Sequence, residues 1–151
     1  MIDELTVRHD KGLAFEDGPD HGRVLVFGRD TGGRYGLMTF TVAPALAGEP
    51  VTYGPHRHRE IEETFLVQSG RLDFLLGEDV ITLAAGDFVR VPPGVRHGYA
   101  NLSGEPVELL VSFHPGGFEE LFVKYRTDGG DPSGGLGFVA EATERFGSEF
   151  E

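Results

Sequence analysis

Three histidines and two adjacent glutamates stand at spacings that suit a metal site. His56 and His58 are two residues apart, so on a β-strand their imidazole rings point to the same face. Glu62 and Glu63 follow at the start of the next predicted strand, and His97 lies in a later one. Because a divalent cation prefers several neutral imidazoles and a carboxylate converging on one point, these residues are candidate metal ligands.

The two glutamates compete for the role of the carboxylate ligand. Glu63 shares its face of the predicted strand with Phe65 and Val67. Glu62 lies on the alternate face, which also carries Thr64 and is more polar. Since the apolar face of a strand packs on the core, the pattern predicts that Glu63 points inward.

The third histidine follows a tight turn. One predicted strand ends at Val91, the segment Pro92-Pro93-Gly94 turns the chain, and a new strand carries His97 inward. Tyr99 and Asn101 share that inward face by the two-residue period of a strand. Tyr99 is a candidate catalytic acid or substrate contact, and the alternative is that it only fills the interior of the fold.

The elements that must position these side chains are mainly strands. Short Gly- and Pro-containing turns separate them, and no helical connection intervenes, which favours an antiparallel sandwich or barrel over a parallel sheet. Two-residue alternation of apolar and polar side chains recurs over residues 23–27, 35–42, 63–67, 71–76, 79–83, 87–91, 96–101 and 107–113.

The pattern changes to a helical period near the end of the chain. Residues 118–125 carry one apolar stripe, which predicts a short helix that packs on the barrel or on a partner. A loop is expected over residues 128–137, and a second short helix over 138–146. We therefore expect an N-terminal extension (1–22), a barrel (23–114) and a C-terminal helical extension (115–151).

Length and composition narrow the class of protein. A chain of 151 residues suits one domain. A formal net charge of −12 repels phosphate backbones and anionic lipids, so we expect no nucleic-acid or membrane partner. The chain has no cysteine, which excludes thiolate metal sites. The first ten residues lack the apolar run of a signal peptide, and cytoplasmic residence is the default expectation.

The two histidine-bearing stretches resemble the two motifs of the cupin family. The first is similar to Gly-x5-His-x-His-x(3,4)-Glu-x6-Gly, and its closing glycine, Gly70, selects Glu63 rather than Glu62 as the carboxylate. The opening glycine of that motif is replaced here by Pro50. The second stretch resembles Gly-x5-Pro-x-Gly-x2-His-x3-Asn, matched by Gly86, Pro92, Gly94, His97 and Asn101.

The resemblance implies an all-β cupin jelly-roll, an antiparallel β-barrel with short C-terminal helices. It implies one divalent transition metal per chain, held by His56, His58, Glu63 and His97. The ion is Fe, Mn, Ni, Co, Cu or Zn, all of which accept this ligand set. Four protein ligands leave one or two positions of such an ion open for a substrate.

Two further segments, 30–34 and 115–122, resemble small bacterial single-domain cupins of the quercetin 2,3-dioxygenase-like type. The first hypothesis is therefore an oxygenase that acts on a flavonol, catechol or enol-type small molecule, with Glu63 doubling as a catalytic base. The alternatives are a non-redox cyclase or isomerase of the polyketide type and a non-catalytic binding module. We also expect a homodimer, because the N-terminal arm and the chain from Val107 onward offer apolar surface.

Overall fold

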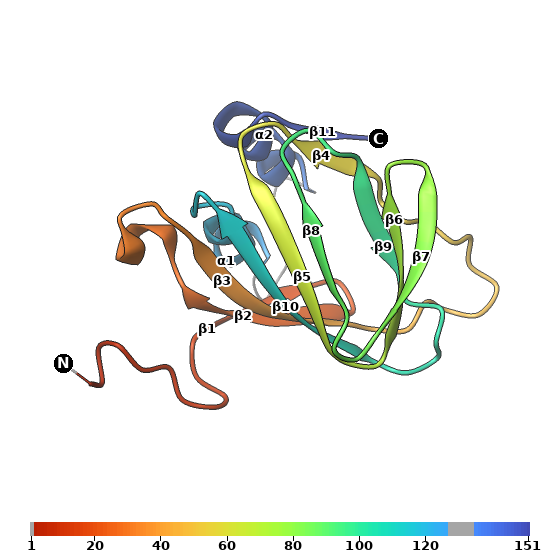
Figure 1. The fold of residues 1–151 in the computed structure, drawn as a ribbon, viewed down its shortest axis with the longest axis horizontal. Coiled ribbons are helices and arrows are strands. Elements are labelled where there is room, and N and C mark those ends of the chain that lie inside the picture. The colour runs from red at the N-terminus through yellow and green to blue at the C-terminus, as the bar shows by residue number, and fades with distance from the viewer. Residues whose placement is uncertain (1, 127–134) are drawn as a thin grey trace.

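Two antiparallel sheets form the framework of the computed structural model, which describes residues 2–126 and 135–151 (Figure 1). The larger sheet contains, in spatial order, β1 (Leu13–Asp17), β2 (Asp20–Val26), β3 (Gly36–Val42), β10 (Val107–His114), β5 (Glu62–Ser69) and β8 (Phe88–Val91). The smaller contains β11 (Ser148–Phe150), β4 (His56–His58), β9 (His97–Ala100), β6 (Arg71–Leu76) and β7 (Asp79–Ala84).

The all-β jelly-roll prediction is confirmed, with one difference in how the sheets meet. Among the described residues, the edge strands of the two sheets are not joined by hydrogen bonds, so the sheets face each other without forming a closed barrel. A short 3-10 helix, η1 (Gly28–Thr31), and two α-helices, α1 (Glu119–Tyr125) and α2 (Leu136–Phe146), complete the fold. Within the described ranges, no helix is long and apolar enough to cross a membrane.

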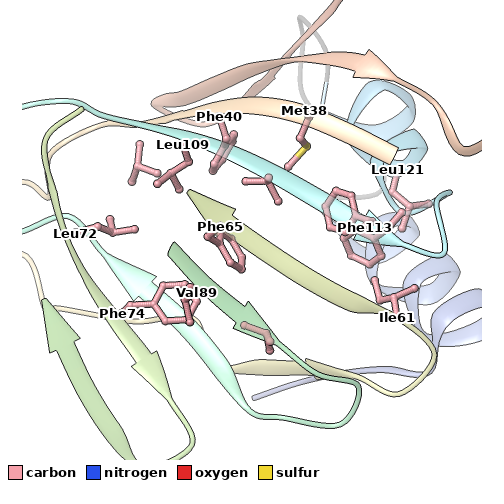
Figure 2. Close-up of a cluster of buried hydrophobic side chains, with 14 of the residues drawn as sticks. Met38, Phe40, Ile61, Phe65, Leu72, Phe74, Val89, Leu109, Phe113 and Leu121 are labelled. Atoms are coloured by element: carbon pink, nitrogen blue, oxygen red, sulfur yellow. The ribbon is translucent and has the colours of Figure 1, made fainter. Parts of the chain in front are cut away.

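The core lies between the sheets, where the inward side chains of both meet (Figure 2). Burial alternates residue by residue along β3 and along the first six residues of β5, as the sequence pattern predicted. Phe65 and Phe74 come from opposite sheets, and their ring centroids lie 5.0 Å apart. Each large apolar side chain buried in this way contributes roughly 1.5–3 kcal/mol, so the two faces are held together mainly by apolar burial.

The two helices pack against their own chain. Phe118, immediately before α1, is buried, and its ring lies 5.8 Å from that of Phe138 and 5.3 Å from that of Phe146, both in α2. Leu121 of α1 is fully buried. The apolar stripe predicted over 118–125 also packs on the larger sheet, where the ring of Phe122 lies 5.0 Å from that of Phe15 in β1. The loop expected over 128–137 lies mostly outside the described residues.

A buried carboxyl group fixes the start of α1. Glu119 is fully buried, and its side chain accepts hydrogen bonds from the backbone N–H groups of Gly28 (2.5 Å) and Gly117 (2.8 Å). Gly36 leaves room for this side chain, because a Cβ there would lie 2.0 Å from Glu119 Oε2. These contacts hold the segment before α1, and hence Phe118, in place against η1.

Two glycines bring the histidine-bearing strands together. Gly94 turns the chain with φ of 82° and donates its backbone N–H to the carbonyl of His58 at 2.7 Å. Gly98 allows the segment before β4 to lie against β9, since a Cβ there would come within 2.1 Å of the Tyr53 carbonyl oxygen. The resulting pairing of β4 with β9 places His56 directly opposite His97.

Candidate metal centre

Four side chains from three strands converge between the two sheets. His56 and His58 come from β4, His97 from β9 and Glu63 from β5 of the facing sheet. One ligand atom from each lies within 4.8 Å of all the others. His58, Glu63 and His97 are at most 6% exposed, and His56 is partly buried. The structure thus brings together the four residues singled out by sequence.

The strand register assigns the two glutamates to different faces. Glu63 points inward, on the same face as the buried Phe65 and Val67. Glu62 points outward, where its carboxylate lies 2.7 Å from the guanidinium of Arg90. The inward orientation predicted for Glu63 is confirmed. Arg90, on the adjacent strand β8, is a surface residue that pairs with Glu62.

The Glu63 carboxylate lies between two of the imidazole rings. Its Oε2 atom is 2.9 Å from His97 Nε2 and 3.4 Å from His58 Nε2. The third ring is close to the other two, since the ring centroid of His56 lies 4.3 Å from that of His97 and 5.0 Å from that of His58. The carboxylate oxygen therefore lies against two of the rings, and the third ring stands beside them.

The opposite ring nitrogen of each histidine is held by a neighbour. Nδ1 of His56 lies 2.7 Å from the carbonyl oxygen of Gly54, and Nδ1 of His97 lies 3.0 Å from that of Val95. A carbonyl oxygen only accepts hydrogen bonds, so both Nδ1 atoms carry hydrogen. When the rings are neutral, each Nε2 atom therefore has a free lone pair. Nδ1 of His58 instead faces the hydroxyl of a serine, at 2.6 Å.

Burial and mutual contact shift the pKa values of this group in different directions. Burial alone would raise the pKa of Glu63, but its close contacts with the imidazoles of His58 and His97 outweigh burial and hold that pKa well below its usual range. Burial would lower the pKa of His97, yet its hydrogen bond with Glu63 raises it. Burial, followed by the charge of His97, lowers the pKa of His56 to about 4.

The donor set fits a divalent transition metal. With Nδ1 of His97 donating to a carbonyl, its Nε2 can face the Glu63 oxygen at 2.9 Å only with a proton or a cation between them. Nε2 of His58 is buried and has no hydrogen-bond partner among the described residues. Imidazole nitrogens with one carboxylate oxygen suit Fe, Mn, Ni, Co, Cu and Zn, so the residues present match the implied group.

An aromatic wall adjoins the cluster. Tyr99 follows His97 on β9, and its ring centroid lies 6.1 Å from that of Phe65 and 6.4 Å from that of Phe74. Burial, and then the negative charges of carboxylates including Glu63, raises the pKa of Tyr99 well above its usual value, so its phenol stays protonated at neutral pH. The interior on this side of the candidate ligands therefore consists of aromatic rings and the Tyr99 hydroxyl.

Asn101 of the second motif has a structural position. It is buried, and its Nδ2 donates to the carbonyl oxygens of Val42 (3.0 Å) and Glu105 (2.6 Å). Its Oδ1 accepts from the backbone N–H of Ser103 at 3.1 Å. These contacts bind the turn between β9 and β10 to the end of β3, and they do not reach the four-residue cluster.

Three residues near the cluster were not predicted from the sequence. Ser148 supplies the hydroxyl beside His58 Nδ1, and the ring of Phe118 lies 4.6 Å from that of His58. The ring of Phe150 lies 5.7 Å from that of His56, with 17° between the planes. Phe118 begins the apolar stripe predicted over 118–125, but that pattern does not place it beside a histidine. No motif or periodicity marks Ser148 or Phe150, because they reach the cluster through the short strand β11.

A separate groove of about 770 Å³ lies against the N-terminal segment. Its lining includes His9 and Asp10 of that segment and outward-facing residues of β2 and β3 such as Arg23 and Thr39. None of the four clustered residues lines it. Its histidines, His9 and His21, are exposed and belong to no group of three or more potential ligands among the described residues, so the candidate metal centre is the cluster between the sheets.

Comparison with known proteins places these observations in a family. The family described as "Cupin domain" matches residues 39–113. An uncharacterized protein of Streptomyces coelicolor is 31% identical over 103 residues, which are 68% of this chain and 90% of that protein. A quercetin 2,3-dioxygenase of Bacillus subtilis is 26% identical over 93 residues, 62% of this chain but only 26% of the dioxygenase.

The fold is also that of solved structures. The polyketide cyclase RemF from Streptomyces resistomycificus superposes with a TM-score of 0.59 at 24% identity, covering 72% of this chain and 78% of that chain. At this identity the likeness concerns the fold alone.

The pKa shifts predict how the metal-free protein responds to acid. A histidine whose folded pKa is lowered stabilises the fold above its unfolded pKa and loses that contribution as pH falls. For His56 the loss runs from pH 6.5 to about 4 and amounts to up to about 3 kcal/mol. His97 acts oppositely, because its raised pKa gives a contribution that is present below pH 6.5 and lost as pH rises.

Urea unfolding between pH 7 and 4, with a chelator present, measures this dependence. The variant His56→Asn should lose less stability over that interval than the wild type. The same substitution at the exposed His9 is the control and should follow the wild-type curve. Equal slopes for His56→Asn and wild type would contradict the assignment of the acid response to His56.

Proposed function

This chain belongs to the cupin superfamily, and on that premise we propose that it is a metal-dependent oxygenase of a flat, oxygen-bearing small molecule. His56, His58, Glu63 and His97 would hold one divalent transition metal. The observation that carries the proposal is the convergence of four ligand atoms within 4.8 Å, beside an aromatic wall. When bound, such an ion supplies Lewis acidity toward a substrate oxygen and, if redox-active, electrons for reaction with dioxygen.

The side chains of this protein would bind and orient the substrate. Phe65, Phe74 and Tyr99 pack together beside the cluster, where their rings would contact a flat molecule and exclude water from it. A polyhydroxylated sugar would need many polar partners, which this wall lacks, so a flavonol, catechol or enol-type compound fits better. Glu63 would accept the phenol or enol proton at its carboxylate, and Tyr99 would donate its hydroxyl hydrogen to a substrate oxygen.

The relatives leave two other functions to be tested against this one. The Bacillus subtilis relative is a quercetin 2,3-dioxygenase, which agrees with an oxygenase, but this chain spans about a quarter of its length. The fold is shared with a polyketide cyclase, which agrees with a non-redox cyclase or isomerase. Such an enzyme would use Glu63 as base and Tyr99 as acid. A binding module without turnover would use the same cluster and wall.

One prediction of this proposed function concerns the metal ligands. The purified protein should bind one metal ion per chain, and His58→Ala combined with His97→Ala should abolish binding, because only two ligands remain. Glu63→Gln should weaken binding by at least ten-fold, whereas Glu62→Gln, a matched change on the outer face, should leave it unchanged. Elemental analysis and competition against a chelator measure both effects. Full occupancy in the double histidine variant would refute the ligand set.

The second prediction concerns the reaction. Protein reconstituted separately with Fe, Mn, Ni, Co or Cu should consume dioxygen together with a flavonol, catechol or β-diketone, in an oxygen-electrode assay. Tyr99→Phe should keep the metal and lower turnover, because the wall is retained while its hydroxyl is lost. Anaerobic conversion of a polyketide-like substrate without oxygen uptake would instead support the cyclase. Saturable binding without any conversion would support the binding module.

We also propose that the protein is a homodimer. The segment before β1 extends away from the sheets (Figure 1) and exposes large apolar side chains, with Ile2 73% and Leu5 80% exposed. Leu13 at the start of β1, on the edge of the larger sheet, is 53% exposed. A sheet edge flanked by apolar side chains is a pairing surface, and a second copy would cover it.

Light scattering after size-exclusion chromatography should give twice the chain mass of 16.4 kDa at micromolar concentration. The double variant Ile2→Asp/Leu5→Asp should shift the mass toward one chain. Leu46→Asp, an equally exposed leucine in the segment between β3 and β4, should not. A wild-type mass of one chain across that concentration range would reject the dimer.

A further inference from the structure

The last strand of the chain lies beside the strand that carries two of the candidate ligands. β11 pairs with β4 in an antiparallel register that sets Ser148 opposite His58 and Phe150 opposite His56. Residues directly opposite each other in a sheet project to the same face, and so do residues two apart on one strand. Ser148 and Phe150 therefore share the inner face of the sheet with both histidines.

Ser148 controls the orientation of the His58 ring. The serine is 1% exposed, and its Oγ lies 2.6 Å from His58 Nδ1. A hydroxyl can accept or donate, whereas the carbonyls behind His56 and His97 only accept. For His58 to offer its Nε2 lone pair to a metal, Nδ1 must carry the hydrogen and Ser148 must accept it.

The ring of Phe150 stacks against the ring of His56. Its centroid lies 5.7 Å from that of His56, and the two planes are within 17° of parallel. His56 is the least buried of the four candidate ligands, and its Nδ1 atom contacts the carbonyl oxygen of Gly54. The stacked ring restricts it from the side of β11.

The strand is also anchored by contacts that avoid the histidines. The Thr143 hydroxyl donates to the backbone carbonyl of Ser148 at 3.1 Å, and the backbone N–H of Glu151 donates to the carbonyl of Pro55 at 3.0 Å. Glu149, on the outer face, pairs with Arg59 through a hydrogen bond of 2.7 Å. Attachment of β11 and contact with the ligands can therefore be separated by substitution.

We propose that β11 is a positioning element of the metal centre, in which Ser148 sets the tautomer of His58 and Phe150 fixes the ring of His56. The inference rests on the proposed function, since it assumes that the cluster binds a metal. Ser148 and Phe150 touch no metal or substrate in this account and act only through the two histidines. The C-terminal segment thus belongs to the site as well as to the fold.

Metal affinity tests the proposal. Cobalt and zinc are titrated separately into the full-length protein in competition with a chelator, and the cobalt absorption spectrum reports the ligand environment. Ser148→Ala should weaken binding roughly 10- to 100-fold, as loss of an outer hydrogen bond to a metal ligand does elsewhere. Ser148→Thr retains the hydroxyl and should restore most of the affinity. Phe150→Ala should weaken binding by a smaller factor.

Thr143→Ala is the matched control, because it removes a hydrogen bond to the same strand without touching a histidine. It should leave the affinity within about two-fold of wild type. An equal loss in Thr143→Ala and Ser148→Ala would overturn the proposal, because attachment of the strand would then explain both. Wild-type affinity in Ser148→Ala would overturn it as well, while leaving the metal centre itself intact.

A second measurement does not need the metal. Nitrogen-15 NMR of the histidine rings in the metal-free protein should show hydrogen on Nδ1 of His58 in the wild type and in Thr143→Ala. Ser148→Ala should give a mixture of tautomers. An unchanged tautomer would overturn the role of Ser148 even where the variant folds. If the wild-type chain binds no metal at all, the proposed function fails and the inference fails with it.

Discussion

Apolar burial holds the two sheets together, and a carboxylate enclosed by imidazoles constrains which strands lie opposite each other. Glu63 is 6% exposed, and an isolated buried anion would cost several kcal/mol in lost hydration. Its compensation comes from His58 and His97, which lie on the opposite sheet. The sheets must therefore face each other with β5 across from β4 and β9. The close packing of Tyr53 against Gly98 and the turn at Gly94 hold β4 and β9 side by side.

The same alternation along the strands produces both the core and the cluster. On β5 the inward side chains are Glu63, Phe65 and Val67. The same strand face therefore carries a candidate ligand at one end and apolar side chains beyond it. On β9 the inward positions pass from His97 to Tyr99. Candidate ligands and aromatic side chains are therefore neighbours on the inner faces of both sheets. The flat, oxygen-bearing substrate proposed above would use both.

Local sequence patterns were sufficient to predict what depends on strand faces. The two-residue period distinguished Glu63 from Glu62, and the spacing of His56 and His58 put both rings on one side. The two-residue period could not predict β11, because three residues are too few to show a period. That strand exists only through its pairing with β4. Nor could it predict that Glu119 is buried, since its two N–H partners include one that is 91 residues away in sequence.

The pairing of β11 with β4 has a consequence for how the chain folds. His58 and Ser148 are separated by 90 residues, while hairpins such as β6 with β7 join neighbours along the chain. Contacts between distant segments must overcome a larger loop-closure entropy, and chains that rely on them fold more slowly. We therefore expect the hairpins to form before β11 pairs with β4, so that the His58 ring acquires its hydroxyl partner late in folding. On this view the site is completed after the sheets that contain it.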